Sequence, residues 1–262
     1  MAVLRELQEN WEGLANIDPL WAICTDPGKR AEKWDPRDFF QSGTNEIARV
    51  LTHVRSLGVH PDPNGKALDF GCGVGRLTQA LSQHFSECYG VDISPTMVRM
   101  AGDFHKQNPR CTFFVNQSDD LQRFPDEDFS FIYTSIVLQH IKTKYAERYL
   151  EECVRVLKPG GIFVFQVPDR NATGILRRIK NRVRLPEQDR GIVGNGESRF
   201  RMEMHCIPEA RVRQVLSGSN IDVLDVKLTN STERSFNGNL EYLDQPPRIG
   251  FVSKQYCVAK HR

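Results

Sequence analysis

Residues 67–77 read ALDFGCGVGRL, and this stretch decides the fold. A short apolar run ends in three glycines at alternate positions, and a segment with helical apolar periodicity follows. The pattern predicts a buried strand, a tight turn and a helix. Glycine lets the backbone turn sharply and lets a ligand lie against the main chain, while the first amides of the helix point at that ligand. The stretch therefore predicts a binding site for a nucleotide-like small molecule at the turn.

The spacing of the glycines argues against two common nucleotide motifs. A dinucleotide fingerprint has glycines at G-x-G-x-x-G, and Arg76 stands where the third glycine belongs. A phosphate-binding loop ends in Gly-Lys-Ser/Thr, which Arg76-Leu77 does not supply. A glycine-rich turn without a ligand is the alternative interpretation.

A second short strand is predicted at residues 88–92, and it ends in Asp92, 17 residues after Gly75. A carboxylate at the tip of the second strand is placed to accept hydrogen bonds from ribose hydroxyls. Ser94 and Pro95 follow as a helix N-cap and a first helical residue. An ordinary aspartate at a helix entry is the alternative for Asp92.

In these segments the chain resembles the class I S-adenosylmethionine-dependent methyltransferases. Five motifs occur in the order of that family: LDFGCGVG (68–75), GVDIS (90–94), FPDEDF (124–129), LQH (138–140) and VLKPGG (156–161). They cover residues 66–167 well and the flanks poorly. The resemblance is specific for a fold and a cofactor, S-adenosylmethionine, and not for a substrate.

The alternation of strands and helices from residue 66 onward predicts an α/β fold with parallel strands and right-handed crossovers. Strands are expected at 66–70, 88–92, 112–115, 129–135, 161–167, 221–228 and 249–259, and helices at 44–57 and 208–218. Residues 229–248 show no helical period, so the last strand lacks a crossover and is expected to be antiparallel. The family likewise has a Rossmann-like, doubly wound, mostly parallel seven-stranded sheet with an antiparallel last strand.

The flanks of this core define the expected organisation. Residues 1–45 are interpreted as a helical N-terminal extension, which either packs on the core or forms a lid. Residues 46–262 are expected to form the cofactor-binding domain, with an insertion at 168–205. Six basic and no acidic residues lie between Arg170 and Pro186. This insertion is either a solvated segment or a substrate flap that recognises an anion.

Composition narrows the class of protein further. With a net charge of +2 over 262 residues, the chain has no large excess of positive charge that would attract a polyanion. No nucleic-acid partner is therefore expected. Seven cysteines without a C-x-x-C pair favour reduced thiols and a cytoplasmic location. No apolar run approaches the ~18 residues of a membrane span, the N-terminal residues do not form a signal peptide, and no spacing predicts a metal.

The resemblance assigns the methionine and ribose portions of the cofactor to the first two strands. The backbone of Gly71, Cys72 and Gly73 is expected to face the methionine portion, and Asp69 its amino group. Asp92 is expected to hold the ribose.

The adenine site is less regular in this sequence. Ile93 and Met97 are expected to offer apolar surface to the adenine. The family usually places an acid after the third strand, and here Gln117 stands at that position, followed by Ser118 and Asp119. A glutamine carbonyl is able to accept the same hydrogen bond, and Asp119 is the alternative.

The reacting atoms are expected near the end of the fourth strand. By resemblance, Ser135 and Ile136 lie under the sulfonium. His140 is the candidate catalytic base for a hydroxyl acceptor, because an imidazole takes protons near neutral pH. A polar histidine that only orders the loop is the alternative, and His205 and Glu203 are reserve candidates.

The sequence thus predicts a methyltransferase that acts on an oxygen or nitrogen of a small molecule, which is anionic if the basic insertion binds it. The absence of Asn/Asp-Pro-Pro-Tyr/Phe and of Pro-Cys disfavours methylation of adenine amines and of cytosine C5. A non-catalytic adaptor that binds the cofactor or an anion is the alternative. A nicotinamide-dependent oxidoreductase is disfavoured by Arg76.

Overall fold

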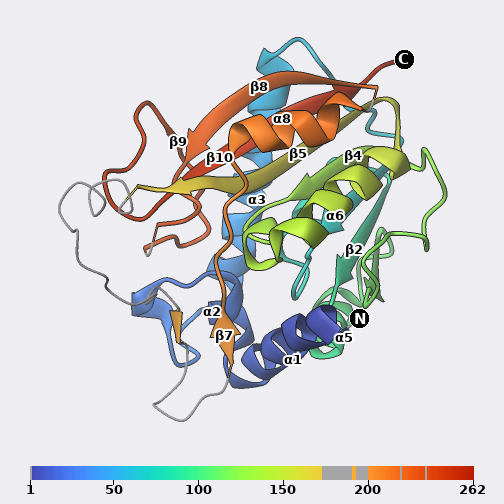
Figure 1. Ribbon diagram of the computed structural model, residues 1–262. Helices are drawn as coiled ribbons and strands as arrows, with labels where there is room; N and C mark the ends of the chain where they lie inside the picture. Colours follow the sequence, from blue (N-terminus) through green and yellow to red (C-terminus); the bar gives the residue numbers. More distant parts are fainter. Residues whose placement is uncertain (1, 173–190, 193–199, 219, 234) are drawn as a thin grey trace, which may run out of the picture.

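The computed structural model describes residues 2–172, 191–192, 200–218, 220–233 and 235–262, and these fold around one mixed β-sheet (Figure 1). The order of its strands is β3-β2-β1-β4-β5-β10-β8-β9. Their bounds are β1 (Lys66–Phe70), β2 (Glu87–Asp92), β3 (Cys111–Val115), β4 (Phe129–Thr134), β5 (Leu157–Asn171), β8 (Ile221–Thr229), β9 (Tyr242–Leu243) and β10 (Phe251–Lys260). A separate pair joins β6 (Gly191–Ile192) to β7 (Arg201–Met202).

The directions of the strands confirm the predicted fold class. β1 pairs in parallel with β2 and β4, β2 with β3, and β4 with β5. β10 runs antiparallel between β5 and β8, as expected for a strand that no helical crossover precedes. The sequence predicted seven strands, and the structure adds β9 at the sheet edge. This strand has only two residues, too few for an alternating pattern to reveal it.

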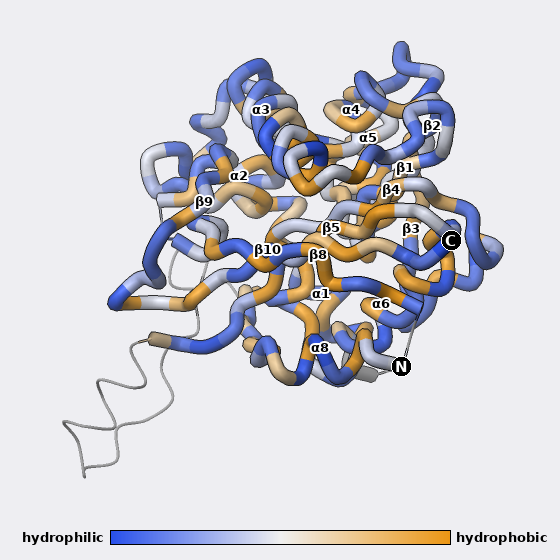
Figure 2. Tube along the Cα trace, turned by 90° about the horizontal axis from the view of Figure 1, so that it is seen from above, coloured by the Kyte–Doolittle hydropathy of each residue, from blue (hydrophilic) through white to orange (hydrophobic). Residues whose placement is uncertain are grey.

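Helices cover both faces of the sheet (Figure 2). Their bounds are α1 (Ala2–Ile17), α2 (Pro19–Ile23), α3 (Pro36–Ser56), α4 (Arg76–Leu81), α5 (Pro95–His105), α6 (Thr143–Val156) and α8 (Glu209–Ser217), with short 3₁₀ turns η1 (Pro27–Lys29) and η2 (Leu138–His140). Residues of α3 and α4 form one apolar core with one face of the sheet, and residues of α6 and α8 form another core with the opposite face. None of the helices in the described ranges is both long and apolar enough to span a bilayer.

Helix boundaries follow the capping residues. Ser94 accepts a hydrogen bond from the Met97 amide at 3.2 Å, which confirms the predicted start of α5. α3 begins at Pro36, eight residues before the predicted helix start at 44, because Asp35 caps it and Pro36 occupies its first turn. The prediction followed the apolar spacing alone and missed this N-terminal signal.

A third apolar cluster attaches the N-terminal segment to the glycine turn. Trp21, Trp34 and Phe39 are buried here together with Val74 of the turn and Met97 of α5. The aromatic residues of the N-terminal extension therefore pack on the core. The boundary at residue 45, which lies inside α3, stays a prediction.

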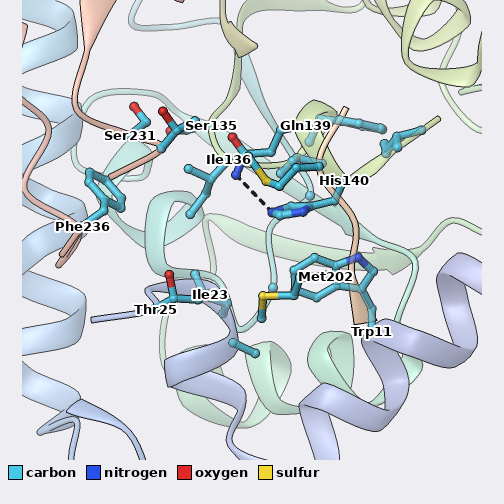
Figure 3. Close-up of a pocket in the computed structure, with 18 of the residues that line it drawn as sticks. Trp11, Ile23, Thr25, Ser135, Ile136, Gln139, His140, Met202, Ser231 and Phe236 are labelled. Carbon is cyan, nitrogen blue, oxygen red and sulfur yellow. Dashed lines mark hydrogen bonds between the residues drawn. The ribbon is translucent and has the colours of Figure 1, made fainter. Parts of the chain in front are cut away.

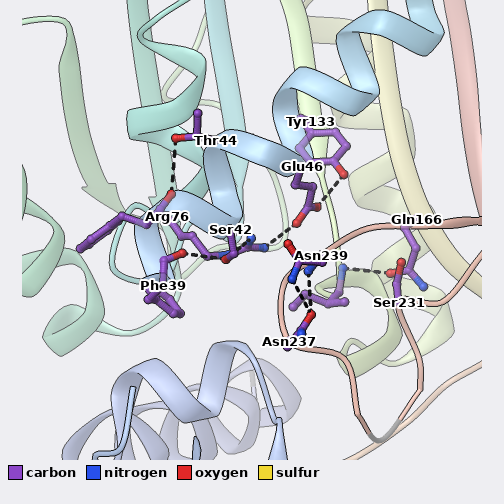
Figure 4. Close-up of polar contacts among 12 residues, drawn as sticks. Phe39, Ser42, Thr44, Glu46, Arg76, Tyr133, Gln166, Ser231, Asn237 and Asn239 are labelled. Atoms are coloured by element: carbon purple, nitrogen blue, oxygen red, sulfur yellow. Dashed lines mark hydrogen bonds and ion pairs between the residues drawn. The ribbon is translucent and has the colours of Figure 1, made fainter. Parts of the chain in front are cut away.

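Arg76 is buried beneath the turn and forms an ion pair with α3 (Figure 4). Its guanidinium lies 2.8 Å from Oε2 of Glu46 and donates to the Ser42 hydroxyl at 3.3 Å. The Tyr133 hydroxyl of β4 donates to the other Glu46 oxygen at 2.7 Å. A buried charge is tolerated only when it is paired and hydrogen-bonded. The residue that breaks the dinucleotide fingerprint thus fixes α4 to α3 and β4.

We expect Glu46→Leu to lower the free energy of unfolding by about 3–5 kcal/mol, because it leaves the Arg76 charge buried without its partner. Urea denaturation measures this change. Asp103→Asn is the control, since it breaks the exposed pair between Arg99 and Asp103 and exposed pairs contribute little. Equal effects of the two substitutions would contradict the role of the buried pair.

Candidate functional site

A cavity of about 930 Å³ lies at the carboxyl ends of β1, β2 and β4 (Figure 3). Its wall includes residues 70–73, 91–93 and 135–137, which end or directly follow these three strands. Open α/β sheets bind ligands at this edge. The volume is near the upper end of the usual range for small-molecule sites, about 300–1,000 Å³, as two neighbouring ligands require.

The turn after β1 needs glycine for its conformation and for the space around it. Gly71 and Gly73 have φ angles of +80° and +53°, in the left-handed region that side chains disfavour. A Cβ atom on Gly71 would overlap the side chain of Val137, and one on Gly73 would lie 2.5 Å from Cδ1 of Ile23. The amides of Gly71 and Cys72 both donate to the Val91 carbonyl, which anchors the turn on β2.

Asp92 links the glycine turn to the start of α5. Its Oδ2 accepts from the Gly73 amide and its Oδ1 from the Ser94 amide, each at 2.9 Å. Burial raises the pKa of this carboxyl group. The Ile93 amide also bonds to this carboxylate. A carboxylate has about four acceptor positions in all, so it keeps capacity for a ligand hydroxyl.

The cavity brings together most of the residues that the sequence proposed for the site. These are Gly71, Cys72, Gly73, Asp92, Ile93, Met97, Ser135, Ile136 and His140. Asp69, Gln117, Ser118 and Asp119 do not line it.

Asp69 is buried on β1 beside α4, where its Oδ2 accepts from the Thr78 hydroxyl at 2.6 Å. Burial raises the pKa of Asp69 to about 7. Strand alternation accounts for this position. Phe70 lines the cavity, whereas the preceding side chain is directed toward the helix that covers the sheet.

The loop after β3 presents Asn116 to the cavity. Gln117 and Ser118 are exposed, and Asp119 forms an ion pair with Arg148 at 3.0 Å. The sequence analysis named Gln117 at this place, whereas the residue that lines the cavity is its neighbour Asn116. Asn116 directly follows the last residue of β3, and this position at the strand end is the signal that would have identified it.

His140 lies at the end of η2, and both of its ring nitrogens have partners. Nδ1 lies 2.7 Å from the Glu203 carbonyl, which only accepts, so Nδ1 carries the proton. Nε2 lies 3.1 Å from the amide nitrogen of Gln139, which only donates, so Nε2 is the acceptor. Burial lowers the pKa of His140 to about 4. The imidazole is thus neutral at pH 7, and the indole ring of Trp11 lies edge-on to it at 5.1 Å.

The reserve candidates lie behind His140 and not at the cavity. Nε2 of His205 is 3.3 Å from a carboxylate oxygen of Glu203, and the His205 amide donates to the Gln139 carbonyl. Neither side chain lines the cavity. The geometry therefore favours His140 among the three candidate bases.

Much of the cavity wall comes from segments without motifs. The lining includes Trp11, Ile23 and Thr25 of the N-terminal segment, Met202 and Met204 at the end of the 168–205 insertion, and Ser231, Phe236 and Phe251 near the last strands. The sequence did not mark these residues as part of a site. A side chain that packs in the core and one that lines a cavity show the same pattern in the sequence. The basic run between Arg170 and Pro186 lies, from residue 173 onward, outside the described residues.

Glu12 fixes α1 beside the site. Its carboxylate accepts from the hydroxyls of Ser94 and Thr96 at 2.6 and 2.5 Å, and from the Thr96 amide at 3.2 Å. A carboxylate at a helix N-terminus is stabilised by the free amides there. The N-terminal segment is thus attached to the loop that carries Asp92.

Comparison with known proteins agrees with this geometry. Residues 68–165 match the family model described as a methyltransferase domain. This part of the chain is a class I methyltransferase domain. The 2-methyl-6-phytyl-1,4-hydroquinone methyltransferase of Synechocystis is 30% identical over 157 residues, which cover 60% of this chain and 48% of that protein. The ubiquinone biosynthesis O-methyltransferase of Coxiella burnetii is 31% identical over 117 residues, 43% and 47% of the two chains.

The chain spans about half the length of the curated relatives it matches. Among solved structures, the magnesium protoporphyrin IX methyltransferase of Synechocystis, with bound SAH, superposes with a TM-score of 0.61. The match covers 97% of both chains at 16% identity, which shows the fold.

We expect His140 to make stability depend on pH between about 4 and 6.5. Its pKa is lower in the folded than in the unfolded chain, so the unfolded chain binds more protons in this window and stability falls as pH falls. His140→Asn should remove at most about 3 kcal/mol of this dependence. Urea unfolding of both proteins from pH 4 to pH 7.5 measures it, and parallel curves would contradict the buried neutral imidazole.

Proposed function

We propose that the protein binds S-adenosylmethionine and transfers its methyl group to an oxygen or nitrogen of a small-molecule acceptor. The observation that carries the proposal is the turn at Gly71–Gly73, free of obstructing side chains and bonded to Asp92 at the carboxyl edge of a parallel sheet. The hydroquinone and quinone-biosynthesis methyltransferases that resemble the chain support methyl transfer to a small molecule, and the name of the second supports an oxygen acceptor.

The residues at this end of the cavity fit the donor. The turn offers main chain to the methionine portion, and Asp92 has free lone pairs for ribose hydroxyls. Asn116, which replaces Gln117 as the proposed adenine partner, has a carbonyl oxygen that is able to accept from the adenine amine. Ser135 is buried and lines the cavity, where its hydroxyl is able to bond to a ligand.

The other end of the cavity suits an acceptor with an apolar body. Met202, Met204 and Phe236 supply apolar surface, and Thr25 and Ser231 supply hydroxyls. Within the described lining the only cation is Arg76, which is already paired with Glu46. An anionic acceptor would therefore depend on the basic residues of the 168–205 insertion.

The protein has two tasks in the reaction: it places the acceptor next to the methyl group, and it takes up the acceptor's proton. When bound, S-adenosylmethionine supplies a methyl group on a cationic sulfur, which is already electrophilic. The cavity holds the acceptor close to it, which is mainly a proximity effect. The attacking oxygen or nitrogen becomes acidic as its new bond forms, so a weak base is sufficient. The unprotonated Nε2 of His140 is the proposed proton acceptor, and its low pKa keeps it unprotonated down to about pH 5.

We expect Gly73→Ala to weaken the binding of S-adenosylhomocysteine at least tenfold, because the added methyl group meets Ile23 and narrows the donor end of the cavity. Isothermal titration calorimetry measures the change. Gly58→Ala is a matched control: its φ of +79° imposes similar backbone strain, and no atom lies within 4 Å of the added carbon. Wild-type protein that fails to bind S-adenosylhomocysteine at millimolar concentration would overturn the proposal.

We expect methyl transfer from radiolabelled S-adenosylmethionine to at least one member of a panel of phenols, hydroquinones and aromatic amines. His140→Asn should lower kcat by about 10²–10⁴-fold for a hydroxyl acceptor, the usual contribution of a general base. The affinity for S-adenosylhomocysteine should stay within twofold of the wild type. Donor binding without turnover on the whole panel would favour the non-catalytic adaptor.

A further inference from the structure

A continuous chain of hydrogen bonds connects the backbone of Ile136 to the ring of His140. The Ile136 amide donates to Oε1 of Gln166 at 2.9 Å. Nε2 of Gln166 donates to Oε1 of Gln139 at 3.2 Å and to the Ser253 hydroxyl at 2.7 Å. Gln139 then donates to Nε2 of His140. Gln166 and Ser253 in the middle of this chain are wholly buried, whereas Ile136, Gln139 and His140 reach the cavity wall. Figure 3 shows the bond between Gln139 and His140.

The main chain fixes the direction of every bond in this series. A backbone amide only donates, so Gln166 must turn its oxygen toward Ile136 and its nitrogen toward Gln139. Gln139 must then present its oxygen to Gln166 and its nitrogen to His140. At the far end the Glu203 carbonyl only accepts, so it holds the proton on Nδ1. The Ile136 amide at one end and the Glu203 carbonyl at the other therefore favour the same tautomer of His140, with the proton on Nδ1.

Ile136 itself shows that this point of the chain is under constraint. Its φ of +55° lies in the left-handed region, which a β-branched residue rarely adopts. Such strain persists only where the surrounding structure enforces it. The bond to Gln166 holds this amide, and the strained turn places Ser135 and Ile136 on the cavity wall.

We propose that Gln166 is a positioning residue of the site: its amide sets the hydrogen-bond direction that keeps His140 protonated on Nδ1 and unprotonated on Nε2. The acceptor's hydroxyl would take the place of the Gln139 amide at Nε2. The catalytic consequence rests on the proposed function, whereas the effect on the imidazole does not.

Several ionisable groups lie around His140. They are Glu6 on α1, Lys142 before α6, Arg201 on β7, and Glu203 and His205 after it. Glu6 and Lys142 lie 3.6 Å apart, and Glu203 and His205 lie 3.3 Å apart. A substitution at Gln166 leaves all five groups unchanged, so it isolates the hydrogen-bond chain.

Gln166→Glu tests the proposal. A carboxylate still accepts from Ile136 but no longer donates to Gln139, so the Gln139 amide should turn over and face Nε2 with its oxygen. That oxygen favours a proton on Nε2, and the proton affinity of His140 should rise about tenfold or more. Titration of the imidazole by ¹⁵N NMR in the ligand-free protein measures both the pKa and the tautomer.

Gln255→Glu is the matched control. Gln255 is the register partner of Gln166 on β10, is also buried, and gains the same charge. Its amide bonds to Tyr133 and Tyr242 and not to the chain that reaches His140. The field of the new charge alone should therefore change the proton affinity of His140 far less than Gln166→Glu does.

Gln139→Leu is a neutral second variant in case Gln166→Glu does not fold. It removes the donor that opposes a proton on Nε2, so the His140 pKa should again rise. The proposal is overturned if neither variant raises the pKa, or if Gln255→Glu raises it as much as Gln166→Glu. Binding of S-adenosylhomocysteine, measured on the same samples, reports separately on the proposed function.

Discussion

The site depends on one constraint, which is that the main chain must turn sharply at the end of β1, with a glycine on each side of Cys72. Left-handed φ angles at Gly71 and Gly73 put two amides of the turn against the Val91 carbonyl and a third on the Asp92 carboxylate. The same Asp92 carboxylate holds the Ser94 amide at the start of α5. The ends of β1 and β2 are thereby fixed to each other before any ligand is present. A preorganised polar surface of this kind lowers the ordering cost of binding.

Elements outside the central fold complete the cavity around this turn. The N-terminal helices are held by an aromatic core and by Glu12, which bonds to the loop after Asp92. Arg76 and Glu46 hold α4 against α3 from beneath. Removing the two charges of this pair from water is unfavourable. The hydrogen bonds that Ser42 and Tyr133 make to the pair offset part of this free energy.

The acceptor end combines an apolar surface with a directed polar chain. Methionine and aromatic side chains form most of the surface, and unbranched thioethers adapt to ligands of irregular shape. Against this surface, the amides of Gln166 and Gln139 orient one neutral histidine. Buried polar chains of this kind are favourable only when every member is satisfied. Specificity for an acceptor would then come from shape, and reactivity from the one oriented nitrogen.

The sequence by itself determined seven strands of the sheet, and most of the site residues that it predicted line one cavity. These features are visible locally in the sequence. They are the apolar runs of the strands, the glycines that a tight turn requires, and Asp92 at the end of a strand. It located the antiparallel last strand because a missing crossover is visible in the chain. It missed the two-residue β9 and the first turns of α3, each of which depends on where an element begins or ends.

Only the tertiary structure decided which residues meet across the cavity. It turned Asp69 toward Thr78 and Gln117 toward solvent, and it brought Trp11 to His140. It also linked Ile136 to Gln166, 30 residues away, and so determined the protonation of the imidazole. Such contacts join residues far apart in sequence. Hydrogen-bond direction and burial depend on partners that no local pattern specifies.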